Sequence, residues 1–128
     1  MILSFDEAGA LLDEMAEEFP PEFYDELNGG ISLLPEAKED SEGEPGELYI
    51  MGEYCNDMMG KYINLYYGSF AALAGQEDWT AEDWEDELYT TLAHELTHHV
   101  ESLANEHGLD DKDEADMLRY LEEYGMRE

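Results

Sequence analysis

The sequence predicts an α+β fold with N-terminal helices, a small three-stranded sheet, a helix that carries an HExxH motif, and a C-terminal helix. Apolar residues recur at helical spacing near both ends of the chain, whereas the middle contains short strand-like runs separated by turns rich in Gly, Pro and Asn. A chain of 128 residues has the size of one domain with a single core. We therefore predict that residues 1–128 form one domain.

The N-terminal segment begins with a capping box, in which Ser4 is followed three residues later by Glu7. Apolar residues then recur every three or four positions as far as Phe19, where two consecutive prolines predict the end of the first helix. A second, short helix is predicted over residues 22–27, because an Asn-Gly-Gly stop signal follows it.

Three strands are predicted in the middle of the chain, over residues 31–35, 48–55 and 61–70. The last two are expected to form a hairpin around a turn at 56–60. Residues 38–46 are polar, acidic and interrupted by Gly and Pro, so we expect a flexible loop there.

The C-terminal third is predicted to contain two helices. A Thr-x-x-Asp pair at 80–83 marks the start of a long helix that reaches about residue 106, with a break expected near 89–91. Gly108 is expected to end it, and a linker at 109–112 leads to a final helix over 113–124. The apolar residues expected to face inward from that helix are Met117, Leu118 and Leu121.

The chain is strongly acidic, with 35 acidic and 5 basic residues and a formal net charge of −30. Such a surface repels phosphate backbones and anionic lipid, so nucleic acid and membranes are excluded as expected partners, whereas cationic peptides and metal ions are favoured. The N-terminus lacks the basic start of a signal peptide, and the single Cys55 has no second cysteine for an internal disulfide. We therefore expect a cytoplasmic protein.

The most specific chemical signal is the segment HELTHH, which contains an H-E-x-x-H pattern. His94 and His98 are four residues apart, so on a helix their imidazoles stack on one face and can bind one Zn²⁺. Glu95 lies beside the first ligand and is the expected general base, which takes a proton from a water activated by the metal. This pattern is typical of zinc peptidases.

The burial pattern of the same helix agrees with the motif, because its apolar residues fall on the side opposite His94 and His98. These apolar residues are Leu88, Leu92, Leu96, Val100 and Leu103. His99 falls at the edge of this apolar stripe. We expect it to be a partly buried histidine that is hydrogen-bonded to backbone or to a carboxylate; contact with substrate is the alternative.

Four segments of the chain resemble a known family. They are HELTHH (94–99), GISLLPE (30–36), LYIMGEY (48–54) and YINLYYGSF (62–70). Together they resemble the small bacterial zincin-like metallopeptidases, the minimal zincins, over nearly the whole chain. The resemblance implies a compact zincin-like domain with one Zn²⁺ per chain and a mixed sheet beside the helix of the two His ligands. It also implies a peptide or protein substrate held by main-chain pairing at an edge strand.

The chain departs from the family pattern at the third metal ligand. Related members have HExxHHxGxxD, in which the Asp reaches the metal, but Glu101 and Ala104 stand at the Gly and Asp positions here. The run GLDD (108–111) looks like the missing piece displaced by seven residues, which is roughly 10 Å of helical rise.

Glu101 is instead our candidate third ligand, because it lies on the histidine face and its side chain leans toward His98. Three ligands from one straight helix fit a tetrahedral ion poorly, so Glu101 is equally a candidate partner of the His98 ring. Asp111, Glu114 or another downstream acid is the remaining alternative.

The leading functional hypothesis is a zinc metallopeptidase, a hydrolase of peptide bonds in which His94, His98 and Glu101 hold the metal and Glu95 is catalytic. Tyr66 or Tyr67 is a candidate donor to the oxyanion, although both are also typical sheet-packing residues. The alternative is a catalytically weak or inactive module that binds metal or peptide on the same fold. A third hypothesis is an assembly domain that uses a free sheet edge.

Overall fold

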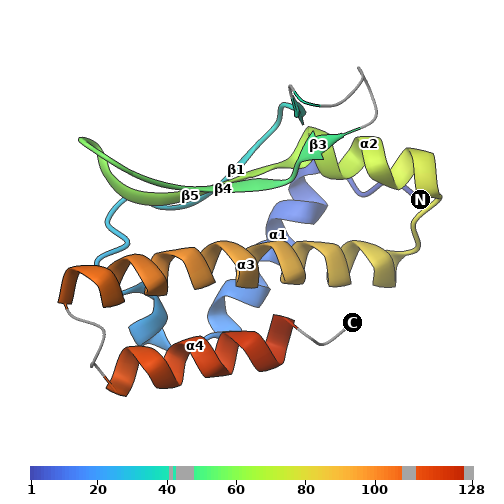
Figure 1. Ribbon diagram of the computed structural model, residues 1–128. Helices are drawn as coiled ribbons and strands as arrows, with labels where there is room; N and C mark the ends of the chain where they lie inside the picture. Colours follow the sequence, from blue (N-terminus) through green and yellow to red (C-terminus); the bar gives the residue numbers. More distant parts are fainter. Residues whose placement is uncertain (41, 43–47, 108–111, 126–128) are drawn as a thin grey trace.

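The computed structural model describes residues 1–40, 42, 48–107 and 112–125, and the side chains at 112–114, 124 and 125 lie outside that description. The predicted α+β class is confirmed: four α-helices, a 3₁₀ helix and five strands lie within the described residues (Figure 1). In chain order they are α1 Phe5–Glu18, η1 Pro21–Tyr24, β1 Gly30–Leu34, β2 Lys38–Glu39, β3 Tyr49–Ile50, β4 Gly52–Asp57, β5 Gly60–Tyr66, α2 Tyr67–Glu77, α3 Ala81–His107 and α4 Lys112–Gly125.

The long helix α3 lies at the centre of the molecule, with the main sheet along one side of it and α4 along the other (Figure 1). The sheet has the order β1-β5-β4, with β1 parallel to β5 and β4 antiparallel to it. This confirms the predicted three-stranded sheet and the hairpin between its last two strands. Strand β4 is at the edge of that sheet and runs along α3, so the register of β4 decides which backbone groups face the helix.

The capping box that predicted the first helix is present. The Ser4 hydroxyl accepts a hydrogen bond from the Glu7 backbone N–H at 3.1 Å, and the Glu7 carboxylate accepts one from the Ser4 N–H at 2.9 Å. Two N–H groups that lack partners within the helix are thereby satisfied. The prediction for residues 22–27 was wrong in type, because only a four-residue 3₁₀ helix, η1, forms there.

The predicted strand over residues 61–70 was too long, because its last four residues form the first turn of a helix, α2. Strand β5 ends at Tyr66, opposite Leu34, where its parallel neighbour β1 also ends. The next free backbone group, the Gly68 N–H, donates to the Glu36 carbonyl at 3.1 Å instead of extending the ladder. The alternating aromatic pattern therefore continues beyond the point where the partner strand stops.

Two predictions for the segment between the first and last strands also need correction. Residues 38 and 39 do not belong to a loop, because they pair with Tyr49 and Ile50 as a second, two-stranded sheet. The predicted strand at 48–55 is divided in two at Met51, whose carbonyl accepts the Tyr66 N–H at 2.9 Å. Residues 41 and 43–47 of the expected loop lie outside the described residues.

Helix α3 is continuous, so the break predicted near 89–91 is absent. The Tyr89 ring is buried and stacks on Phe19, with 5.3 Å between ring centroids. Packing of this kind outweighs the weak helix propensity of the two threonines that follow. The predicted helix end at Gly108 and most of the linker at 109–112 lie outside the described residues.

The core forms between α3 and the elements around it. The predicted apolar stripe is confirmed, since Leu88, Leu92, Leu96, Val100 and Leu103 are all buried. On α4, Leu121 is buried while Met117 and Leu118 pack half-buried against the core, as predicted. Within the described ranges, no helix combines the length and the apolar character needed to cross a bilayer.

Candidate metal centre

The two histidines of the HExxH motif project side by side from α3. Their ring centroids are 4.6 Å apart, and the His94 Nε2 and His98 Nε2 atoms approach to 3.1 Å. Both side chains are exposed, whereas Leu92 and Leu96 on the opposite side of the helix are fully buried. The buried leucines fix the orientation of the helix, and the spacing of four residues places both histidines on its outer face, where their side-chain rotamers bring the two nitrogens together.

The nitrogen pair fits a divalent metal ion. Two atoms that bind one tetrahedral zinc ion at about 2.0–2.1 Å lie roughly 3.3 Å from each other. The observed separation of 3.1 Å between the Nε2 atoms requires only a small adjustment of the rings. Imidazole nitrogen is also a common ligand of zinc. His94 and His98 are therefore suited in both position and chemistry to hold one ion.

Glu101 lies on the outer side of His98. Its Oε1 atom is 3.6 Å from His98 Nδ1, the ring nitrogen that points away from His94. A carboxylate in this place favours the tautomer with a proton on Nδ1, which leaves a lone pair on Nε2 for the metal. At 3.6 Å this is an ion-pair contact and not a hydrogen bond, so the second of the two roles predicted for Glu101, a partner that orients the ring, stays a prediction.

A complete set of three ligands is not assembled from the predicted residues that the structure describes. In the described part of the chain, His94, His98 and Glu101 do not bring three ligand atoms within 4.8 Å of one another. Asp111 lies outside the described residues, and so does the side chain of Glu114. The choice between Glu101 and a downstream acid as third ligand stays a prediction.

Glu95 is turned away from the solvent and is only 6% exposed. Burial raises the pKa of its carboxyl group, while the nearby His94 and His98 rings and a hydrogen bond from the Tyr54 backbone N–H lower it less strongly. A buried carboxylate with a raised pKa is a better proton acceptor than a solvated one. Glu95 thus has the environment expected of a general base.

A groove of about 330 Å³ opens beside His94 and Glu95. Its other lining residues are Ile50, Met51, Gly52, Thr90 and Thr91, so it lies between α3 and the segment that joins β3 to β4. A Cβ atom placed on Gly52 would lie 2.9 Å from Thr91 Cγ2 and 3.4 Å from Glu95 Cγ. The absence of a side chain therefore allows the edge strand to approach the histidine helix closely. The sequence analysis overlooked this glycine, although a glycine inside a strand signals close backbone approach.

The two tyrosines considered as oxyanion donors already donate elsewhere. The Tyr67 hydroxyl donates to the Leu3 carbonyl at 2.6 Å, and the Tyr66 hydroxyl donates to Glu53 Oε1 at 2.5 Å. Lys38 Nζ also donates to Glu53 Oε1, at 2.6 Å. Tyr66 is also buried in the sheet, which is the alternative role considered for it, whereas Tyr67 packs against the core from the start of α2.

His99 is hydrogen-bonded to backbone, as predicted, but it is fully buried where partial burial was expected. Its Nε2 atom is 2.7 Å from the Asp25 carbonyl oxygen, and its Nδ1 atom is 2.9 Å from the Tyr54 hydroxyl. A carbonyl only accepts, so the ring proton is on Nε2 and the Tyr54 hydroxyl donates to Nδ1. Burial lowers the pKa of His99. This neutral ring joins the edge strand β4 to the backbone after η1; the sequence analysis did not identify Tyr54 as its partner.

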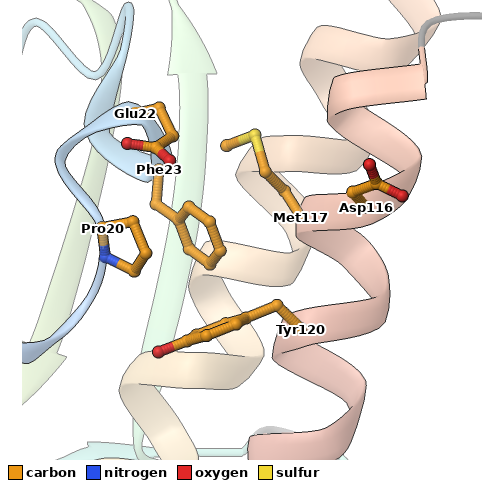
Figure 2. A pocket seen from close by; sticks show the side chains of 6 residues that line it. All are labelled: Pro20, Glu22, Phe23, Asp116, Met117 and Tyr120. Carbon is orange, nitrogen blue, oxygen red and sulfur yellow. The ribbon is translucent and has the colours of Figure 1, made fainter.

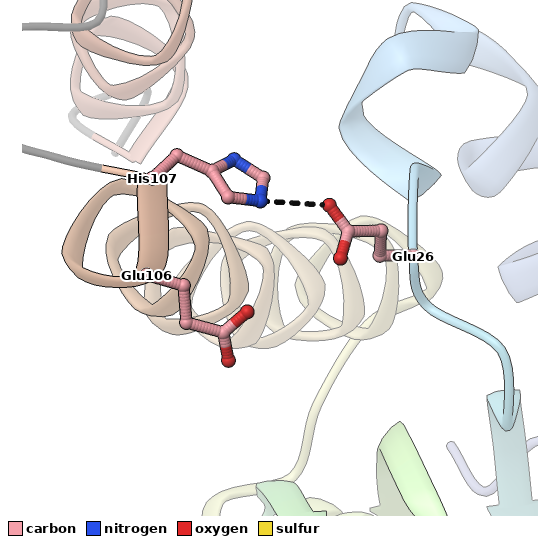
Figure 3. A group of neighbouring side chains, drawn as sticks. All are labelled: Glu26, Glu106 and His107. Carbon is pink, nitrogen blue, oxygen red and sulfur yellow. Dashed lines mark ion pairs between the residues drawn. The ribbon is translucent and has the colours of Figure 1, made fainter.

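A second group of potential ligands lies at the end of α3, where Glu26, Glu106 and His107 place their ligand atoms within 4.8 Å of one another (Figure 3). The Lys61 ammonium lies against this group, 3.0 Å from Glu106 Oε2 and 3.8 Å from Glu26 Oε1. His107 Nε2 is 3.1 Å from Glu26 Oε2. Because Lys61 already supplies positive charge, we interpret these exposed groups as a surface ion-pair network.

A larger cavity of about 490 Å³ lies between η1 and α4, away from the histidine pair (Figure 2). Its lining consists of Pro20, Glu22, Phe23, Asp116, Met117 and Tyr120. Phe23 and Tyr120 form its aromatic wall, with 5.1 Å between ring centroids. The described lining contains two carboxylates, Glu22 and Asp116, but no histidine or cysteine, so it does not offer the nitrogen and sulfur ligands typical of a zinc site.

Comparisons with known proteins identify a relative among solved structures. Neither a protein-family model nor a curated protein matches the sequence. A solved structure of a conserved hypothetical protein from T. thermophilus is 34% identical, with a TM-score of 0.67. The match covers 80% of this chain and 99% of that protein. The chain belongs to the same family as that protein. The description of this relative names no reaction, so within the family the function has to be argued from the site.

Proposed function

We propose that the protein is a zinc-dependent hydrolase of peptide bonds, with His94 and His98 as metal ligands and Glu95 as general base. The observation that carries the proposal is the 3.1 Å approach of the two exposed Nε2 atoms. Its support comes from the adjoining groove, which is lined by His94 and Glu95 and bordered by an edge strand. A metal ligand pair, a buried carboxylate and an open approach are three of the parts that such a hydrolase needs, and a third protein ligand is the part still to be assigned.

Zinc bound at this pair would supply a Lewis acid that polarises the scissile carbonyl and acidifies water. Glu95 would accept the proton of the attacking water and deliver it to the leaving amine. The contact of Glu101 with His98 Nδ1 would keep the Nε2 lone pair directed toward His94. Every one of these roles uses a group whose position is fixed by α3.

The edge strand offers main-chain groups to an extended substrate. The Tyr66 N–H donates to the Met51 carbonyl, and pairing alternates along an antiparallel ladder. Gly52 and Tyr54 therefore direct their N–H and carbonyl groups away from β5. A peptide that pairs with β4 at Gly52 would lie in the groove beside His94.

The test is a comparison of Glu95→Gln and His94→Ala with the parent protein. Glu95→Gln should keep one zinc per chain, measured by plasma emission spectroscopy after dialysis, and lose about 10²–10⁴-fold in kcat on a peptide library. His94→Ala should lose the zinc as well. As a control, Glu122→Gln on α4 makes the same substitution at an exposed site and should change neither the zinc content nor kcat. Full activity of Glu95→Gln would remove this residue from the mechanism.

A binding module without catalysis is the second candidate function. The observation that favours it is the position of Glu101 on the far side of His98, which leaves two convergent protein ligands in the described part of the chain. Two imidazoles hold zinc less tightly than a complete set of three ligands. Zinc that is lost to a weak chelator, together with no cleavage at saturating zinc, would support the module over the enzyme.

A further inference from the structure

One histidine of the HELTHH segment has no part in the proposed chemistry. His99 follows the candidate ligand His98 directly, yet it is fully buried. An imidazole in the interior costs desolvation that a leucine would not, and it is tolerated where its nitrogens have partners. Here the Tyr54 hydroxyl on β4 lies 2.9 Å from Nδ1, and the Asp25 carbonyl after η1 lies 2.7 Å from Nε2. The ring therefore joins α3 to two other parts of the fold.

Strand β4 and helix α3 run side by side in the same direction (Figure 1). Three successive contacts join them: Gly52 beside Glu95, Tyr54 with His99, and Asn56 with Ser102. Two strand residues advance about 6.8 Å and three to four helix residues about 4.5–6 Å, so successive inward-facing residues of β4 meet successive turns of α3. The first contact lacks a side chain on the strand and the third is exposed to solvent. The hydrogen bond between Tyr54 and the buried His99 is therefore the directional contact at the centre of the row.

This contact determines where the free edge of the sheet stands. Pairing with β5 fixes the register of β4 within the sheet, but the distance of β4 from α3 is set by contacts with the helix. Gly52 and Tyr54 are two residues apart and therefore lie on the same side of the strand, with their N–H and carbonyl groups directed away from β5. A shift of Tyr54 would move these groups together with the wall of the groove at Gly52.

We infer that Tyr54 and His99 are positioning residues of the proposed site. Their hydrogen bond holds the edge of β4 at the place from which a paired peptide reaches an ion between His94 and His98. The Asp25 carbonyl keeps the proton of His99 on Nε2, so Nδ1 is left to accept from Tyr54. This inference rests on the proposed function. It assigns the last histidine of the segment to substrate placement, through β4, and not to metal binding.

The experiment compares Tyr54→Phe with Tyr24→Phe in the full chain loaded with zinc. Each substitution removes one hydroxyl hydrogen bond, and that of Tyr24 goes to the Ala16 carbonyl at 2.5 Å, away from the groove. Both variants should lose stability and keep the zinc of the parent, because His94 and His98 are exposed on α3. Only Tyr54→Phe should lower kcat/KM on a blocked hexapeptide, by about tenfold, since a misplacement of about 1 Å costs up to about 10²-fold.

Two variants of His99 test the hydrogen bond itself. His99→Gln keeps a donor and an acceptor in the side chain, whereas His99→Leu is apolar and keeps neither. At equal zinc content, His99→Gln should recover most of the kcat/KM that is lost in His99→Leu. Parent activity in His99→Leu would overturn the positioning role. If neither variant folds, the comparison of Tyr54→Phe with Tyr24→Phe decides.

The remaining outcomes separate this inference from the proposed function. An equal loss of kcat/KM in Tyr54→Phe and Tyr24→Phe, or no loss in either, overturns the positioning role and leaves the hydrolase standing. If the parent cleaves no peptide, binding of dye-labelled hexapeptides to the zinc-loaded proteins is measured by fluorescence anisotropy. Weaker binding by Tyr54→Phe alone supports the positioning role while hydrolysis is refuted. Equal binding by both variants and the parent, or no binding by the parent, overturns both.

Discussion

The replacement of Gly52 by alanine gives the most direct test of the contact between the edge strand and the histidine helix. The added Cβ would lie 2.9 Å from Thr91 Cγ2, 3.3 Å from the Asn64 carbonyl oxygen and 3.4 Å from Glu95 Cγ. The optimal separation of two carbon atoms is about 3.5–4.0 Å. The contact with Thr91 is thus well inside the repulsive range, and the branched threonine side chain has little rotamer freedom on a helix.

The expected loss of stability follows from two opposing effects. Overpacking of this kind costs about 1–3 kcal/mol, whereas replacing a glycine reduces the entropy of the unfolded chain and returns about 0.4–1 kcal/mol. A net loss of about 1–2 kcal/mol remains. For 128 residues, an unfolding entropy of about 2.1 cal/mol/K per residue converts this loss into a decrease of about 4–7 °C in Tm.

The assay is thermal unfolding followed by circular dichroism, with two comparison variants. Gly75→Ala on α2 adds a methyl group where no atom lies within 4 Å, and should leave Tm unchanged or raise it. Thr91→Ser removes the clashing methyl group. The double variant with Gly52→Ala should therefore recover at least half of the decrease in Tm caused by Gly52→Ala alone. The reasoning is refuted if Gly52→Ala unfolds at the parent temperature, or if Thr91→Ser gives no rescue.

Two further predictions concern the hydrogen bonds around β4. Tyr54→Phe leaves the buried His99 Nδ1 without its hydrogen-bond donor, so the free energy of unfolding measured in urea should fall by about 1–2 kcal/mol. An unchanged urea midpoint would show that this hydrogen bond contributes nothing to stability. Hydrogen bonds from Lys38 and Tyr66 lower the pKa of Glu53 below its ordinary 4.5, so the folded state favours the ionised carboxylate. That contribution is present above pH 4.5 and is lost as the pH falls through the lowered pKa, so Glu53→Gln should be less stable than the parent at pH 7 and equal to it in acid. Because the Glu53 side chain is one-third exposed, we expect the two proteins to differ by less than about 1 kcal/mol in free energy of unfolding at pH 7. A stability difference that does not change with pH would contradict this account.

Local pattern was sufficient to predict the helix of the metal centre. The apolar stripe on α3 fixes which side is buried, and His94 and His98 follow from it because four residues make about one turn. The same reasoning placed His99 at the edge of the stripe, where it is in fact buried. It gave no information on the Tyr54 partner, because that contact joins residues 45 positions apart through the packing of a strand on a helix.

Local pattern failed where another part of the chain decides the outcome. In the segment after β5, alternating aromatic residues continue the strand pattern to Phe70, but β1 offers no partner beyond Leu34. The alanines that follow and the helical spacing of the buried Phe70 and Ala74 were the available signals for α2. Similarly, Lys38 became part of a strand because Ile50 pairs with it, which a polar, Gly-rich stretch does not indicate.

The difference between local pattern and contacts with distant parts of the chain also explains why the sequence predicts the histidine pair of the candidate metal site but not the groove beside it. The two histidines lie on one face because of the pitch of a single helix, so the spacing of the motif is enough to predict that their rings can meet, as the 3.1 Å between the Nε2 atoms shows. The groove depends on how closely β4 approaches that helix, and this distance is set by the single missing side chain at Gly52. The HExxH motif thus predicts where two candidate metal ligands meet, whereas the groove beside them depends on a glycine in a strand that is distant in the sequence. A search for proteins that share this candidate site should therefore require a glycine in the edge strand opposite the motif as well as the motif itself.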